Sequence, residues 1–332
     1  MMLAERQEAL PANQNMQTFP PANVPTPPPD LSIIIVNWNT RDLLAQCLAS
    51  VYTDRPEGAF EVFVVDNASA DGSAQMVRER FPWVRLIENA ENVGFARANN
   101  QAIRRSKGRY VLLLNPDTVV QPGALGTLVR FMDEHPQAGA AGARLLNPDG
   151  SLQPSCHPLP TLSRELWRLV HLDVLRPYAV YPMTQWNTDT PHRVEGAQGA
   201  CLILRREVLD EVGTLDEDYY IYSEEVDLCY RLQRSGWAIF WVPQARVIHY
   251  GGQSTKQVAP QMFLRLYEGK VLFFRKNRGW VAAQMYKLIL LCAALARLLL
   301  SPLAWLEHPP QRDLHLALAG HYWRLVRTLP GF

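Results

Sequence analysis

Short apolar runs alternate with segments of helical periodicity along residues 31–135. The runs are five or six residues long and rich in Val, Ile and Leu, as buried strands are. Between them, apolar side chains recur every three or four residues, which is typical of amphipathic helices. We therefore predict an α/β fold with a Rossmann-like, mostly parallel sheet that helices cover on both faces. The predicted strands are 31–36, 61–66, 84–88 and 110–115, and the predicted helices are 41–51, 71–81, 95–107 and 122–135.

The pattern is less regular after residue 135, and it ends in a helical, partly apolar extension. Residues 280–306 are strongly apolar, but their longest uncharged stretch covers only 288–296. That stretch is shorter than the roughly 18 apolar residues that a membrane-spanning helix requires. Further strands are predicted within 194–205 and at 238–242, and further helices at 206–212 and 224–235.

The polar side chains of this apolar segment fall on one arc of the predicted helix. They are Gln284, Lys287, Arg297 and Ser301. This pattern favours a helix in the membrane interface whose basic residues lie at the lipid headgroups. The alternative is a helix that packs on the rest of the protein or on a second copy in a homodimer.

Composition and charge bound the organisation of the chain. Residues 1–29 are Pro-rich and polar, without the apolar core of a secretory signal, so we predict a disordered segment before a domain at 30–260 and a helical segment at 261–332. The 33 basic and 32 acidic residues nearly balance, which argues against nucleic acid as a partner. The five cysteines are scattered and indicate core positions in a reducing compartment.

Polar side chains occur where three of the predicted strands end. Open α/β sheets bind ligands at the edge formed by the carboxyl ends of their strands, so these residues are candidates for a binding site. Asp and Asn also favour turns, and each of them taken singly is consistent with a turn. The residues are Asn37 and Asn39, Asp66 and Asn67, and Asn115 and Asp117.

Three further segments carry candidate chemistry. In 92–100, Gly94 opens a helix whose N-terminus can face an anion, with Arg97 as a nearby cation, although a capped surface helix fits equally.

Acidic residues in 224–231 suit the first turn of a helix. Among them, the i,i+4 spacing predicts a structural ion pair between Asp227 and Arg231, and leaves Glu224 or Glu225 as the candidate base.

His249 follows an apolar run and precedes two glycines, which permit close approach of a ligand to the backbone. A hydrogen-bonded structural histidine is the alternative for this position.

These segments together resemble the inverting family 2 glycosyltransferases with the GT-A fold, in the branch that includes rhamnosyltransferase-like enzymes of polysaccharide assembly. They occur in the family's order across residues 31–254. The matching segments are IIIVNWN at 33–39, VVDNAS at 64–69, NVGFARANN at 92–100, LLNPD at 113–117, GA at 199–200, EEVDLCYR at 224–231 and VIH at 247–249.

The resemblance implies a role for each candidate. Asp117 corresponds to the carboxylate of the family's DxD metal motif and His249 to a position that completes the metal site, with Mg²⁺ or Mn²⁺ as the cofactor. Glu225 corresponds to the general base, with Glu224 beside it. Asn115 stands at the first DxD position, where it brings no charge, so Asp117 must supply the main protein carboxylate. The residues implied for nucleotide-sugar binding are Asn37, Asn39, Asp66, Asn67, Asn92, Gly94, Arg97, Asn100 and Asn115.

The implied reaction moves a sugar from a nucleotide-diphosphate donor to a glycan or polyprenyl-linked acceptor, at the cytoplasmic face of the cell membrane. Two other classes of function are alternatives. A nucleotidyltransferase would carry a Gly-rich basic loop after its first strand, and NWNTR at 37–41 is not one. A non-catalytic sugar-binding or membrane-binding scaffold would not need Asp117 and Glu225, and both are present.

Overall fold

The computed structural model describes residues 29–56, 58–302 and 309–332. Residues 1–28 of the predicted Pro-rich segment and residues 303–306 of the predicted apolar segment lie outside these ranges. The strands are β1 (Leu31–Asn37), β2 (Phe60–Asp66), β3 (Arg85–Glu88), β4 (Tyr110–Leu114), β5 (Thr118–Val120), β6 (Ala138–Leu146), β7 (Cys156–His157), β8 (His192–Val194), β9 (Gly196–Ala197), β10 (Cys201–Arg205) and β11 (Ala238–His249). The α-helices are α1 (Arg41–Thr53), α2 (Ser73–Arg80), α3 (Phe95–Ile103), α4 (Ala124–Glu134), α5 (Leu162–Leu169), α6 (Arg206–Val212), α7 (Glu224–Arg234), α8 (Gln253–Lys256), α9 (Ala259–Arg278), α10 (Trp280–Leu300) and α11 (Pro309–Thr328).

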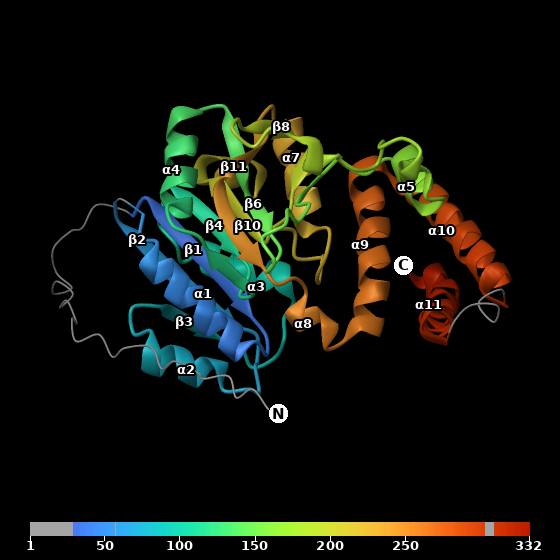
Figure 1. Ribbon diagram of the computed structural model, residues 1–332, viewed down its shortest axis with the longest axis horizontal. Coiled ribbons are helices and arrows are strands. Elements are labelled where there is room, and N and C mark those ends of the chain that lie inside the picture. The colour runs from blue at the N-terminus through green and yellow to red at the C-terminus, as the bar shows by residue number, and fades with distance from the viewer. Residues whose placement is uncertain (1–28, 57, 303–308) are drawn as a thin grey trace, which may run out of the picture.

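One mixed sheet forms the centre of the molecule (Figure 1). Its strand order is β3-β2-β1-β4-β10-β6-β11-β5, and β8 pairs with β11. Strands β3, β2, β1 and β4 are parallel, whereas β10 runs antiparallel to both of its neighbours, β4 and β6. The parallel register aligns Asn37 with Asp66, so the polar residues that follow β1 and β2 meet at one edge of the sheet.

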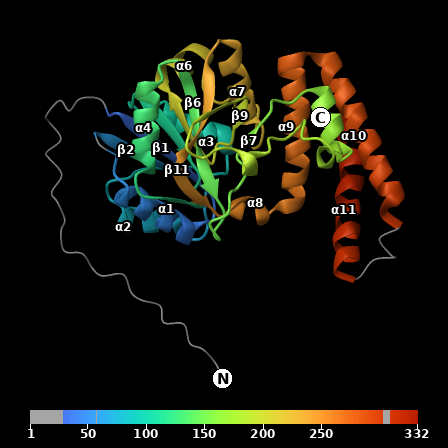
Figure 2. The same ribbon diagram turned by 45° about the horizontal axis from the view of Figure 1, so that its top comes forward.

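Helices cover both faces of this sheet, as the alternation of elements predicts (Figures 1 and 2). Ile33 and Ile35 of β1 belong to a buried cluster with Leu48 of α1 and Leu128 of α4. Ile34 and Val36 belong to a second cluster, with side chains from α3, α6, α7 and α9. Successive side chains of a strand point to opposite faces, so a strand buried on both faces must be apolar throughout, as β1 is apart from Ser32 and Asn37.

The last long strand extends further than expected. The prediction placed a strand at 238–242, but β11 continues to His249. Its pairing with β6 shifts register between Val242 and Arg246, a span that contains Pro243. Because proline has no N–H to donate, a central strand accommodates it only at such an irregularity. The continuation carries His249 to the edge of the sheet where β4 ends, opposite Thr118 of β5.

A buried polar network joins the C-terminal helices to the first half of the chain. Glu165 of α5 is buried and accepts hydrogen bonds from Lys270 of α9 at 3.1 Å and from the hydroxyl of Tyr286 of α10 at 3.2 Å. Arg168 forms an ion pair with the same carboxylate. Helices α5, α9 and α10 therefore form one layer at the side of the sheet (Figure 2).

Helix α10 buries one face and exposes another. Ala283, Tyr286, Leu290 and Ala294 are buried against its neighbours. The exposed face is apolar along its length and includes Val281 (64% exposed), Met285, Leu288 (60%), Leu295 and Leu299 (81%). Among the described residues, α10 is the one helix long and apolar enough to cross a membrane, and a single such helix is weak evidence that it does.

Two basic residues of α10 have partners within the protein that periodicity did not predict. Arg297 does not point toward the solvent side of the apolar face but donates to the carbonyl of Leu169 and lies over the ring of Tyr322. Lys287 donates to the carbonyl of Pro330. Both cations therefore bind carbonyl oxygens at helix ends, because packing against α5 and α11 gives them partners that periodicity alone could not show.

Candidate active site

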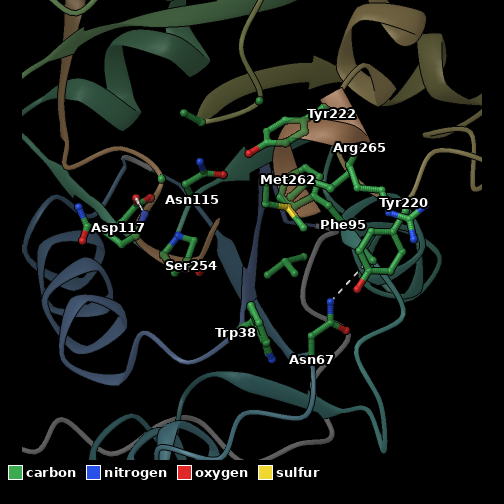
Figure 3. Close-up of a pocket in the computed structure, with 18 of the residues that line it drawn as sticks. Trp38, Asn67, Phe95, Asn115, Asp117, Tyr220, Tyr222, Ser254, Met262 and Arg265 are labelled. Atoms are coloured by element: carbon green, nitrogen blue, oxygen red, sulfur yellow. Dashed lines mark hydrogen bonds between the residues drawn. The ribbon is translucent and has the colours of Figure 1, made fainter. Parts of the chain in front are cut away.

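A cavity of about 600 Å³ lies at the edge of the sheet where β1 and β4 end (Figure 3). Its walls come from the loops after β1 and β4, the start of α3, the start of α7 and the first turns of α9. Eight of the predicted site residues line it, namely Asn67, Asn92, Gly94, Asn115, Asp117, Glu224, Glu225 and His249. The sequence segments that resemble the family therefore converge on one cavity, as the position of the strand ends predicts.

Asn37, Asn39 and Asp66 lie behind the cavity and shape its wall. The Asn37 amide donates to Asp66 at 2.9 Å, and the second carboxylate oxygen of Asp66 accepts the backbone N–H of Ser69. Asn39, at a φ of 51°, accepts the N–H of Ala70. These bonds fix the two loops that carry Trp38 and Asn67 into the cavity.

Trp38 is a cavity residue that sequence reasoning missed. It stands between Asn37 and Asn39 and reaches the floor of the cavity near Asn67 (Figure 3). An aromatic residue between two polar residues at a strand end was the available signal, because a large flat ring in that position can stack on a planar ligand.

Gly94 lies at a close approach between two elements of the wall. Its φ is 87°, and a Cβ atom there would be 2.6 Å from the carbonyl oxygen of Tyr220. The N–H of Phe95 donates to that carbonyl at 2.7 Å, and Asn92 accepts the N–H of Gly94. Only glycine fits this position, so the predicted need for Gly94 at the start of the helix has a steric origin.

Arg97 and Asn100 are not among the residues that line the cavity. Asn100 is buried and donates to the carbonyl of Leu215 at 2.7 Å and to Glu217 at 3.0 Å. Arg97 is half-exposed and pairs with Glu217. Both side chains point from α3 toward the loop before α7, because positions 97 and 100 lie on one side of the helix. In this structure they hold that loop rather than a ligand.

Asp117, Asn115 and His249 form a polar group at one side of the cavity. His249 Nε2 lies 3.3 Å from Asp117 Oδ1 and 3.3 Å from the Asn115 amide nitrogen. The other ring nitrogen, Nδ1, lies 2.6 Å from Gln153 Oε1. Because the Gln153 amide nitrogen already donates to the His249 and Asn147 oxygens, Oε1 must accept, and Nδ1 carries the proton.

In this tautomer Nε2 is the unprotonated nitrogen, and it lies beside the Asn115 amide and a carboxylate oxygen of Asp117. A lone pair and a carboxylate that face each other at 3.3 Å suit a cation between or beside them. A histidine whose other nitrogen donates to a fixed acceptor is also the usual arrangement of a metal ligand. The residues present therefore fit a divalent cation, with Asp117 and His249 as its protein ligands. No third His, Cys, Asp or Glu joins them among the described residues.

Glu224 and Glu225 occupy the first turn of α7 on another wall of the cavity. Burial raises the pKa of both carboxyl groups, and repulsion from Glu225 raises that of Glu224 further. One oxygen of each, Oε2, is buried and has no hydrogen-bond partner among the described residues. Two buried carboxyl groups with raised pKa values and free oxygens are suited to take up a proton from a bound molecule.

The strained turn before α7 is held by α9. Tyr222 and Ser223 both have positive φ values, 69° and 74°. Gly269 of α9 packs so closely that a Cβ atom there would be 2.6 Å from the Tyr222 carbonyl oxygen. Positive φ is costly for residues with side chains and persists only where surrounding structure enforces it. Helix α9 therefore positions the two glutamates.

The acidic residue next to this pair has a different role. Asp227 forms an ion pair with Arg231 at 2.8 Å and accepts a hydrogen bond from Asn277 at 2.7 Å. The predicted structural pair between Asp227 and Arg231 is confirmed, and the Asn277 contact ties α7 to α9.

Known proteins are similar to this chain in fold or in sequence. A mannosyltransferase from Pyrobaculum calidifontis, solved with GDP-Man and Mn²⁺, aligns with a TM-score of 0.54 and 20% identity over 92% of this chain and 85% of that chain. An N-acetylglucosaminyl-diphospho-decaprenol L-rhamnosyltransferase from Mycobacterium tuberculosis is 32% identical over 278 residues, which cover 77% of this chain and 87% of that protein. The rhamnosyltransferase WbbL of Escherichia coli is 24% identical, over 70% of this chain and 87% of its own length.

The sheet and its helices have the GT-A-like fold that the sequence segments predicted. Residues 32–213 match the glycosyl transferase family 2. Together with the 32% identity to the mycobacterial protein, this match shows that the chain belongs to glycosyl transferase family 2. Neither the nucleotidyltransferase nor the non-catalytic scaffold is favoured by these findings.

Proposed function

We propose that this enzyme is an inverting, metal-dependent glycosyltransferase that moves a sugar from a nucleotide-diphosphate donor to a glycan or polyprenyl-linked acceptor. The observation that carries the proposal is the division of the cavity. Asp117 and His249 offer a cation site on one wall, and the free carboxylate oxygens of Glu224 and Glu225 lie on another. Inverting transfer needs these two functions on separate elements.

The donor nucleotide would occupy the part of the cavity lined by Trp38, Asn67, Asn92 and Gly94 (Figure 3). The Trp38 ring supplies a flat apolar surface for a base. Asn37, Asn39 and Asp66 contribute by fixing the loops of this wall.

Asp117 and His249 would hold Mg²⁺ or Mn²⁺. With two protein ligands, diphosphate oxygens and water must complete the coordination, which is common for these ions. When bound, the cation stabilises negative charge on the leaving diphosphate as a Lewis acid. Gln153 keeps His249 in the tautomer with Nε2 unprotonated, and a cation at Nε2 would take the place of the Asn115 amide that lies against this nitrogen.

Glu225 would act as the base. The acceptor hydroxyl must lose its proton as its oxygen attacks the anomeric carbon, and a carboxylate on the acceptor side can take that proton. A single displacement with the base opposite the leaving group inverts the configuration at that carbon. Glu224 lies beside Glu225; burial and then repulsion from Glu225 raise the pKa of the Glu224 carboxyl group.

The relatives suggest the donor sugar. Two of them are named rhamnosyltransferases, and one of these names a diphospho-decaprenol acceptor. We therefore expect dTDP-rhamnose to be the preferred donor in cell-surface polysaccharide synthesis. A panel of nucleotide sugars with Mn²⁺ or Mg²⁺, read by thermal shift and by release of nucleoside diphosphate, tests this. If no nucleotide sugar shifts the melting temperature or releases nucleoside diphosphate, the proposed function is wrong.

The exposed face of α10 would place the enzyme on the inner face of the cell membrane. Residues 259–332 contain ten Lys and Arg residues against three Asp and Glu residues, a net charge of +7. The remaining 23 basic and 29 acidic residues precede them and give a net charge of −6. An apolar helix face within a basic segment is suited to an anionic lipid surface, which attracts the cations and receives the apolar side chains.

We expect Leu288→Glu combined with Leu299→Glu to weaken flotation with anionic vesicles at least tenfold. Each change replaces an apolar side chain that would be buried in the lipid by a carboxylate that anionic headgroups repel. Tyr52→Glu is the matched control, because Tyr52 is an exposed apolar residue on α1, in the sheet domain. Flotation that is equal in all three proteins would contradict membrane binding by α10. A homodimer that the double variant dissociates would instead assign the face to a second copy.

A further inference from the structure

A second cavity opens next to the active site and shares a wall with it. It has a volume of about 390 Å³. Tyr220, Ile221 and Arg265 line both cavities. The second cavity is otherwise formed by the loop before α7, the middle of α9 and residues 331–332, with Arg275 as a second basic residue.

Arg265 is the basic side chain at the junction. Among the described side chains that line the active-site cavity, it is the one arginine or lysine. Its Nη1 donates to Glu268 at 2.7 Å, and its guanidinium lies 5.0 Å from the centre of the Tyr220 ring. Both side chains of the Arg265–Glu268 ion pair are about two-fifths exposed, and an exposed ion pair of this kind contributes little stability.

The guanidinium retains donors for an anion. Glu268 engages one nitrogen, and an arginine side chain carries five N–H donors in a planar arrangement that matches phosphate oxygens. Glu268 and the Tyr220 ring keep the group at the junction, so little conformational freedom would be lost when an anion binds. In the second cavity, Asp218 is paired with Lys276, which leaves Arg275 available on the same wall.

The position of Arg265 separates it from the proposed donor diphosphate. Figure 3 shows Asp117 and Arg265 at opposite sides of the active-site cavity, with Tyr222 and Met262 on the Arg265 side. A cation held by Asp117 and His249 would place the donor diphosphate on that side of the cavity. An anion at Arg265 would therefore belong to the other substrate, which enters from the side of α7 and α9.

We propose that the second cavity is the acceptor subsite, and that Arg265 and Arg275 bind a diphosphate that links the acceptor sugar to its lipid. The inference rests on the proposed transferase function and adds the residues that would bind the acceptor. A diphosphate at the junction places the attached sugar in the active-site cavity, where Glu224 and Glu225 lie. The lipid leaves by way of the second cavity, along α9.

The test compares two acceptors that carry the same sugar. One is an N-acetylglucosaminyl diphosphate linked to a short lipid, and the other is a neutral alkyl N-acetylglucosaminide. Nucleoside diphosphate release gives kcat and KM for each. We expect the wild type to prefer the diphosphate acceptor, and Arg265→Gln to reduce that preference in kcat/KM by about 10- to 100-fold, as loss of a charged hydrogen bond implies. Arg275→Gln should reduce it by a smaller factor in the same direction.

Arg278→Gln is the control, since Arg278 is on α9 but lines neither cavity and lies over Tyr230. It should leave the preference at the wild-type value. Arg265→Lys should retain part of the preference, because it keeps the charge and loses the planar donors. The inference is overturned if Arg265→Gln slows both acceptors equally or raises the KM of the donor. A wild type that turns over neither acceptor with any donor contradicts the proposed function itself.

Discussion

Replacing Glu225 by glutamine is expected to lower turnover by about 10²–10⁴-fold while donor binding survives. Glutamine keeps the size and polarity of the side chain but cannot take up a proton. The buried Oε2 of Glu225 has no hydrogen-bond partner in the part of the chain that the structure describes, so the substitution breaks no described hydrogen bond of that atom. Steady-state release of nucleoside diphosphate measures turnover, and thermal shift with the donor measures binding.

Glu207→Gln is the matched control for this experiment. Glu207 is also in the first turn of a helix, α6, but it is exposed and lines none of the cavities described above. It should leave turnover unchanged. If Glu225→Gln also left turnover unchanged, Glu225 would not be the base. If Glu224→Gln abolished turnover instead, the assignment would pass to Glu224.

The same pair predicts a pH dependence. Burial raises the pKa of Glu224 and Glu225 above the ordinary value, and the base must be deprotonated to act. Turnover should therefore fall on the acid side at a pH above the range of an exposed glutamate. Glu224→Gln leaves Glu225 buried, so the acid limb should stay above the range of an exposed glutamate in that variant. The stability of the folded state changes with pH in the opposite direction to turnover. A carboxyl group whose pKa is raised by folding favours the folded state at low pH, and this contribution is lost as the pH rises through the raised pKa.

The second large effect is expected for Asp117→Asn, which should reduce metal-dependent turnover by about 10²–10³-fold. Asparagine keeps the shape but removes the carboxylate, and Asn115 brings no charge that could replace it. Titration of Mn²⁺ in the presence of the donor, followed by thermal shift, should show the loss of the metal-dependent part of binding.

Asp189→Asn provides the comparison, since Asp189 is exposed and outside the cavity. That variant should bind donor and metal as the wild type does. Metal-dependent donor binding at full strength in Asp117→Asn would remove Asp117 from the metal site.

The positions of the strand ends could be predicted from the sequence, and with them much of the cavity. The run that ends at Leu114 places Asn115 and Asp117 at the edge of the sheet because the parallel pairing of β1 with β4 leaves no other position for them. The antiparallel insertion of β10 could not be predicted, since strand direction depends on the path of the chain between strands. The periodicity of α3 was equally uninformative about which of its polar residues face the cavity.

Site residues from elements that are distant in the sequence could not be predicted either. Arg265 and Met262 lie in a segment that sequence patterns assign to the extension after residue 260, yet both line the active-site cavity. Arg97 and Asn100 matched a family segment, but Glu217, more than a hundred positions later in the sequence, binds both of them. Local patterns carry no information on such pairings.

The Glu165 carboxylate sets a rule for engineering acceptor specificity. Chimaeras between family members would ordinarily exchange the C-terminal helices as one block, with the junction near residue 260. Here that block contains Lys270 and Tyr286, but their common partner, Glu165, lies before the junction, so the other parent supplies the residue at that position. A graft that brings a different residue at position 165 would leave a buried ammonium group without its counterion, at a cost of about 3–5 kcal/mol. Functional chimaeras should therefore inherit Leu162–Leu169 together with the C-terminal helices.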